Sequence, residues 1–93
     1  KITLSKSITK ITEATFAYCS KLNNAALPES VKKVENLAFF GCSGLLKVRI
    51  PKSVTEIGEL AFYASNSSLV LKVKKSSYAH EFAKAQGIQY AIY

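Results

Sequence analysis

The sequence contains no aspartate and a single histidine, His80, which removes several enzyme classes at once. A Ser-His-Asp triad cannot be assembled without aspartate, so only a triad with glutamate in its place would be possible. The two cysteines, Cys19 and Cys42, are too few for a disulfide-stapled miniprotein, and no CxxC motif or Cys/His cluster is present to hold zinc. The four glycines are isolated, so no phosphate-cradling loop exists. We therefore expect no enzyme, no metal and no cofactor.

Long apolar runs are also missing. No stretch approaches the roughly 18 consecutive apolar residues of a membrane-spanning helix, and no signal peptide opens the chain, so any export signal would lie upstream of Lys1. The 93 residues are 48% hydrophobic and 20% charged, which indicates one folded domain. Thirteen Lys and Arg against six Glu give a net charge of +7. A basic balance of this kind suggests acidic partners.

A repeat runs through most of the chain. Three units of equal length follow one another without a gap: SITKITEATFAYCSKLNNAALPE (7–29), SVKKVENLAFFGCSGLLKVRIPK (30–52) and SVTEIGELAFYASNSSLVLKVKK (53–75). Phe16, Phe39 and Phe62 share one column, which predicts a ladder in the core. Residues 1–6 fit the end of a preceding, truncated coil. A unit of this length with the apolar spacing L-x-x-V-x-I lies in the range of leucine-rich repeats.

Each unit predicts a strand, a turn and a short helical segment. In residues 45–50 the β-branched side chains alternate with basic ones, as a strand with one buried face requires. Pro51 ends that strand. Residues 54–57 are a shorter extended piece or the start of a turn, and 58–63 suit one turn of α-helix or 3₁₀ helix. The predicted fold is an α/β repeat solenoid, a right-handed coil with a parallel β-sheet on one face.

The segments SVTEIGELAFYA and CSGLLKVRIP resemble the BspA-like leucine-rich repeats, which occur mainly in surface proteins of bacteria and some parasitic protists. The resemblance covers about residues 1–75. It departs at Thr15, Ser65 and Ser68, where alanine, cysteine and leucine are usual. It implies an extracellular or cell-surface location, with surface adhesion or contact with host matrix as the expected role.

The repeat stops after Val73, and residues 76–93 are predicted to form a cap. Ser76 and Ser77 are candidate N-cap residues, and Gly87 is a candidate C-terminal stop for a helix of about ten residues. Apolar residues recur at helical spacing at Tyr78, Phe82 and Ala85. Residues 88–92 alternate as a final strand that would shield the last coil. Because the N-terminal side has no such cover, we expect a single domain from the C-terminal part of a longer protein.

The reactive side chains receive structural interpretations. His80 lies off the apolar positions of the predicted helix, so we expect a solvated surface residue. Cys19 and Cys42 occupy equivalent positions of neighbouring coils, which places them about 5 Å apart. A column of buried thiols is favoured there over a disulfide, and both alternatives remain open. Glu13 and Glu59 share a column with nothing apolar around it, which favours a solvated face over a glycosidase pair.

The strand positions that alternate away from the core carry the positive functional prediction. They stack as Lys1/Asn24/Lys47/Val70 and Thr3/Ala26/Arg49/Lys72. Repeat proteins commonly bind partners on such surfaces. The candidate partner-binding residues are Asn24, Lys47, Arg49, Val70 and Lys72, with Lys74 as an extension.

The leading hypothesis is a non-enzymatic module that binds a protein or an acidic glycan. The alternative is a passive stalk or spacer that presents another domain, because exposed lysines also keep a strand surface soluble. Nucleic acid is a weaker candidate, since no stacking aromatics alternate with the basic residues. We expect the fragment to be a monomer.

Overall fold

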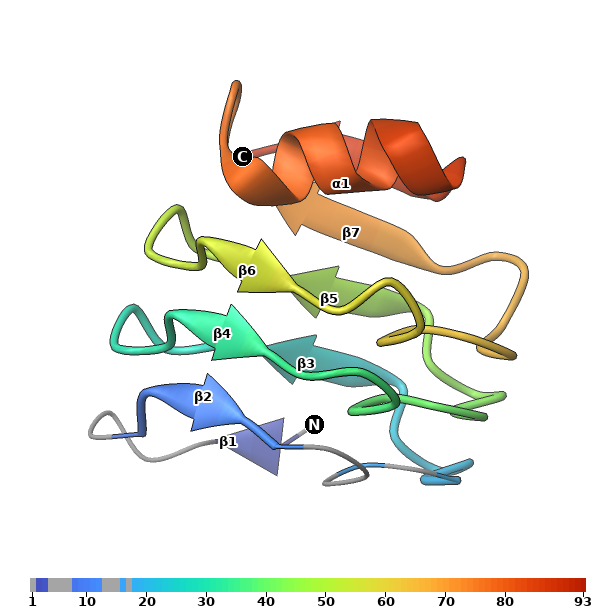
Figure 1. Ribbon diagram of the computed structural model, residues 1–93. Coiled ribbons are helices and arrows are strands. Elements are labelled where there is room, and N and C mark those ends of the chain that lie inside the picture. Colours follow the sequence, from blue (N-terminus) through green and yellow to red (C-terminus); the bar gives the residue numbers. More distant parts are fainter. Residues whose placement is uncertain (1, 4–7, 13–15, 17) are drawn as a thin grey trace.

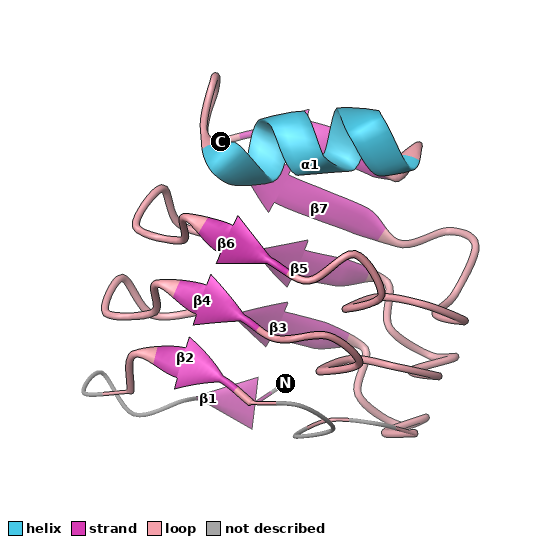
Figure 2. Cartoon of the chain, viewed as in Figure 1, coloured by secondary structure: helices cyan, strands magenta, loops and turns pink. Residues whose placement is uncertain are grey.

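The computed structural model describes residues 2–3, 8–12, 16 and 18–93 (Figure 1). Short strands alternate between two rows, and a helix and a last strand follow (Figure 2). The elements are β1 (Ile2–Thr3), β2 (Lys10–Ile11), β3 (Asn24–Ala26), β4 (Lys33–Val34), β5 (Lys47–Arg49), β6 (Glu56–Ile57), β7 (Val70–Val73), α1 (Tyr78–Gln86) and β8 (Gln89–Ile92). Lys1, Glu13 and Thr15, singled out above, lie outside the described residues.

The strands form two parallel sheets. One has the order β1-β3-β5-β7-β8 and the other β2-β4-β6 (Figure 1). The repeat register is confirmed, because Asn24 pairs with Lys47 and Lys47 with Val70, each time the equivalent residue of the next unit. The predicted parallel sheet is present, and of the two alternatives for residues 54–57 the short extended piece is found: Glu56–Ile57 is a strand that pairs in register with Lys33–Val34, in a second sheet that the sequence did not predict. Val34 and Ile57 are buried, so this second row closes the core from the other side.

The segment predicted as a helical turn is not helical in the second and third units, which form hydrogen-bonded turns instead. In the second unit the backbone N–H groups donate alternately to carbonyls within the turn and to carbonyls of the next coil. Phe40 donates to Leu37 within the turn, whereas Phe39 and Gly41 donate to Ala61 and Tyr63 of the next coil. A helix would need every N–H to bond locally, so pairing between coils replaces it. The right-handed sense of the coil stays a prediction.

The core is one continuous apolar cluster between the sheets. Its centre is the predicted phenylalanine ladder, which is confirmed: the Phe39 ring stacks on Phe16 at 5.2 Å and on Phe62 at 5.1 Å between centroids. Phe82 of α1 continues the row at 6.3 Å from Phe62. Phe39 is fully buried. Each coil therefore completes the core of its neighbour.

Two departures from the family pattern have local explanations. Ser65 occupies the repeat position of Cys42, and its hydroxyl donates to the Phe39 carbonyl at 3.0 Å, just as the Cys42 thiol donates to Phe16 at 2.8 Å. Ser68 is exposed, and Leu69 fills the core of the third unit instead. The amide oxygen of Asn66 accepts the Ser68 N–H at 2.7 Å and holds this altered turn.

The predicted cap is present. Ser77 is the N-cap of α1, since its hydroxyl accepts the His80 N–H at 3.1 Å, and Gly87 ends the helix in the left-handed conformation with φ 70°. β8 then pairs parallel to β7. The buried helix face is Ala79, Phe82 and Ala83, not the predicted Tyr78, Phe82 and Ala85. Two alanines beside Phe82 let the helix lie close to the last coil, which the larger Tyr78 would prevent.

Among the described residues, α1 is far too short to cross a bilayer, and no other helix there is long and apolar enough to do so.

Candidate partner-binding strand face

The candidate residues lie together on the outer side of the five-stranded sheet. Buried Ala25, Val48 and Leu71 alternate with outward residues along β3, β5 and β7. The pairing places Asn24, Lys47 and Val70 side by side, and Ala26, Arg49 and Lys72 side by side. We call Asn24, Lys47, Arg49, Val70 and Lys72 the strand face. The sequence predicted this arrangement because a parallel repeat in register keeps equivalent residues adjacent.

The strand face is hollowed. A depression of about 300 Å³ is lined by Asn24, Ala25, Ala26, Lys47, Arg49 and Lys72. Lys47 and Arg49 are exposed and Lys72 is half-buried. Ala26, beside Arg49, leaves room that a longer side chain would fill. The hollow therefore offers amide, ammonium and guanidinium donors around a small-residue centre.

Tyr93 organises one edge of this surface, and the sequence analysis did not find it. Its ring centroid lies 4.4 Å from the Arg49 guanidinium carbon and 4.2 Å from the Lys74 Nζ. Its hydroxyl donates to the Ile50 carbonyl at 3.3 Å, and its N–H donates to the Val73 carbonyl at 3.0 Å. Continuing the alternation of β8 by one residue beyond Ile92 would have placed this tyrosine outward. Cation–π contact holds Arg49 in one place beside the hollow.

The strand face is electrostatically uncompensated. In the part of the chain that the structure describes, no carboxylate lies within ion-pair distance of Lys47, Arg49 or Lys72, whereas ion pairs occur elsewhere, at Lys10–Glu35, Lys33–Glu56 and Lys84–Glu81. Cations without partners raise the local positive potential, which attracts and steers anionic ligands. Part of the net charge of +7 is thus placed where a partner could meet it.

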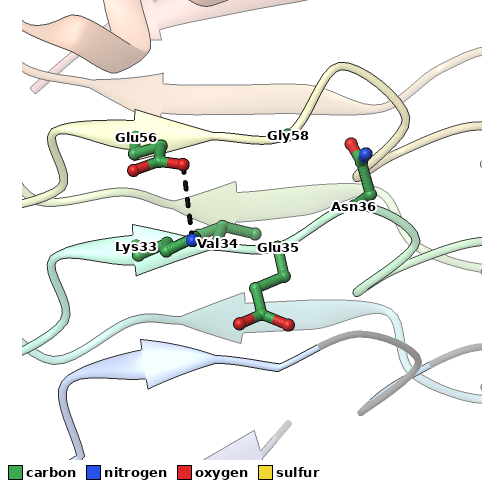
Figure 3. Close-up of a pocket in the computed structure, with 6 residues that line it drawn as sticks. All are labelled: Lys33, Val34, Glu35, Asn36, Glu56 and Gly58. Carbon is green, nitrogen blue, oxygen red and sulfur yellow. Dashed lines mark ion pairs between the residues drawn. The ribbon is translucent and has the colours of Figure 1, made fainter.

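On the three-stranded sheet, in contrast, the charged side chains are paired with one another. Its hollow of about 310 Å³ is lined by Lys33, Val34, Glu35, Asn36, Glu56 and Gly58 (Figure 3). Lys33 Nζ lies 3.4 Å from Glu56 Oε2, and Lys10 Nζ lies 3.6 Å from Glu35 Oε2. Lys33 is part of β4. Charges here are matched within the molecule, so this face offers less to a charged partner.

Among the described carboxylates, neither Glu56 nor Glu59 has the surroundings of a glycosidase general acid. The Glu56 side chain is 62% exposed and paired with a lysine, and Glu59 is exposed. A general acid needs an apolar pocket that keeps it protonated, which neither position provides. Glu13 lies outside the described residues.

The remaining reactive side chains serve the fold. His80 is half-buried rather than solvated, because its Nδ1 accepts the Ser76 N–H at 2.8 Å and its ring lies 4.8 Å from that of Tyr90. Cys19 and Cys42 are free thiols, as the favoured interpretation expects, but only Cys42 is buried and Cys19 is half-buried. Burial raises the pKa of the Cys42 thiol. No cluster of three or more His, Cys, Asp or Glu suited to a metal occurs among the residues the structure describes.

Two parallel sheets that each take one strand from every repeat unit, with turns between the strands, define a repeat protein of the solenoid class. A family model described as a BspA type leucine rich repeat region (6 copies) matches residues 1–84. The chain therefore belongs to the BspA-type leucine-rich repeat family, which confirms the resemblance seen in the sequence. No curated protein and no solved structure matched the chain.

Family membership carries a coarse functional statement. Leucine-rich repeats of this type are generally non-enzymatic binding or scaffold repeats, which indicates a module for protein interaction. BspA-like repeats are typically found in surface proteins.

Proposed function

We propose that this chain is a non-enzymatic binding module of an extracellular or cell-surface bacterial protein, and that it holds a protein or glycan partner on the strand face. The use that fits such a module is adhesion. One observation carries the proposal: Lys47, Arg49 and Lys72 lie together without a carboxylate partner among the described residues, whereas the three-stranded sheet pairs Lys10 with Glu35 and Lys33 with Glu56.

The physical reason is complementarity. A solvated cation without a partner costs little in the free protein, and it gains attraction when an acidic surface approaches. The hollow of about 300 Å³ lets an acidic group sit between the three side chains rather than above them. Charge-assisted hydrogen bonds formed there are stronger than those between neutral groups.

Neutralising the strand face tests this proposal. The variant Lys47→Gln/Arg49→Gln/Lys72→Gln should lose at least about tenfold in affinity for any matrix protein or glycan that the native chain binds at near-physiological salt. Binding is measured on immobilised partners. The matched control is Lys10→Gln/Lys33→Gln/Lys84→Gln, which removes the same charge from ion-paired positions and should keep its affinity.

Failure would take one of two forms. If the native chain binds none of the partners, or if both variants lose affinity equally, a passive spacer becomes the better account. Selective loss in the strand-face variant supports the binding module.

A further inference from the structure

We propose that the strand face continues past Tyr93 into a second basic hollow, and that the two hollows together hold one extended acidic glycan. This inference rests on the proposed function and deepens it, because it names the partner's chemical class and adds residues to the site.

The second hollow lies where the strands of the large sheet end. It measures about 480 Å³ and is lined by Glu29, Lys52, Lys74, Lys75, Ile92 and Tyr93. Lys52 and Lys75 are equivalent residues of adjacent coils, each the last residue of its repeat unit. All three lysines are exposed, and none of them forms an ion pair with a carboxylate in the described part of the chain. The side chains of the lining therefore carry three cations and one carboxylate, that of Glu29.

Tyr93 joins the two hollows. Arg49 lines the first hollow and Lys74 the second, and both cations contact the Tyr93 ring, at 4.4 and 4.2 Å from its centroid. Two like charges on one ring repel each other, and an anionic ligand that passes between them would relieve that repulsion. The hydrogen bond from the Tyr93 hydroxyl to Ile50 fixes the ring in this position. The basic surface is thus continuous from Lys47 to Lys75.

The surface suits a glycan better than a protein or a nucleic acid. Protein interfaces depend on a few buried aromatic or aliphatic anchors, and the strand face offers only the half-buried Val70. Single-stranded nucleic acid needs free aromatic rings for base stacking, whereas the Tyr93 ring is already in contact with two cations. A carboxylated or sulfated sugar chain needs spaced cations along a track, which both hollows supply. Exposed Ile92 adds an apolar surface for the C–H face of a sugar ring.

The experiment compares a short and a long heparin oligosaccharide as probes of the native 93-residue chain at near-physiological salt. Only the long probe reaches both hollows. The variant Lys52→Gln/Lys75→Gln should weaken binding of the long probe roughly tenfold and leave the short probe unchanged. The matched control is Lys10→Gln/Lys33→Gln, which removes two charges from the other sheet and should change neither affinity.

Tyr93 variants test the junction in the same assay. Tyr93→Phe keeps the ring and should retain most of the affinity for the long probe, whereas Tyr93→Leu removes the ring and should weaken it several-fold. Thermal unfolding of both variants separates loss of the contact from loss of the fold. Equal affinities of the two variants for the long probe would overturn the assigned role of Tyr93.

The outcomes separate this inference from the proposed function. If the strand-face variant loses its partners while Lys52→Gln/Lys75→Gln binds the long probe normally, the second hollow is not part of the binding site, and the proposed binding module stands. Poly-L-glutamate or single-stranded DNA that binds as tightly as heparin would overturn the glycan class. If the chain binds a matrix protein through the strand face but no heparin of either length, the inference fails and the proposed function survives.

Discussion

Among single residues, the clearest contrast is between the two thiols. Cys42 is fully buried, whereas Cys19 is half-buried, although both occupy the same position of the repeat. Burial is the main cause that raises the pKa of the Cys42 thiol; a backbone hydrogen bond at Cys19 opposes this rise, and the charge of the Cys19 thiol adds to it. The thiolate is the reactive form, so both access and ionisation protect Cys42.

We therefore predict two alkylation rates in the native protein near pH 8, with Cys19 fast and Cys42 slow, measured by mass spectrometry. The variants Cys19→Ser and Cys42→Ser identify each phase, and denaturant should make the rates equal. Two equal alkylation rates in the native protein would contradict the burial of Cys42.

Burial of Cys42 also makes stability depend on pH. Because the folded state raises the pKa of the Cys42 thiol, its contribution to the free energy of unfolding is complete below the ordinary thiol pKa and is lost as the pH rises through the folded value.

At the scale of elements, the cap helix depends on its first turn. The Ser77 hydroxyl accepts the His80 N–H, and His80 in turn accepts the Ser76 N–H, so two backbone donors at this helix start are satisfied by side chains. Ser76 has φ 64°, a left-handed conformation that needs such support. The helix buries Ala79, Phe82 and Ala83 against the last coil, so its stability and that of the array are coupled.

Removing the cap should destabilise the protein measurably. Ser77→Ala should lower the free energy of unfolding by about 1 kcal/mol, within the range of about 0.5–2 kcal/mol for N-cap serines. The control is Ser67→Ala on an exposed turn, which should change it by less than about 0.5 kcal/mol. Chemical denaturation gives both values. Equal effects would show that Ser77 does not act as the cap.

Sequence reasoning predicted the elements with strong periodic signals and missed those without. The large sheet and its outward columns follow from the repeat register, as the Asn24–Lys47–Val70 pairing shows. The small sheet was missed because a strand as short as β6 has no alternation to detect. Tyr93 was missed because β8 leaves the repeat register when it pairs with β7: Val70 lies opposite Gln89, so the repeat columns do not extend into the cap.

Across the whole molecule, stacking of coils makes stability a shared property. Phe39 touches the rings of the coils before and after it, and every side of it is buried. Each unit alone would leave its apolar layer open to water. Removing the Phe39 ring therefore removes packing contacts from three coils, its own and the two beside it.

Phe39→Ala should lower the free energy of unfolding by about 3–5 kcal/mol, which is a large part of the stability of so small a domain and could unfold it. Lys33→Gln, which breaks only an exposed ion pair, should change it by about 0.5 kcal/mol or less. Chemical denaturation followed by circular dichroism measures both. A loss below about 1 kcal/mol for Phe39→Ala would contradict the ladder.

The contact between Arg49 and Tyr93 fixes where in the array the proposed site lies. Most surfaces of a repeat protein recur with every unit, but Tyr93 comes from the cap and occurs once. Adding units on the β1 side would lengthen the molecule by about 4.8 Å each, the spacing of neighbouring strands, and would leave this junction unaltered. Array length and ligand specificity can therefore change separately in evolution, one through coils added on the β1 side and the other through the coils next to the cap and the cap itself.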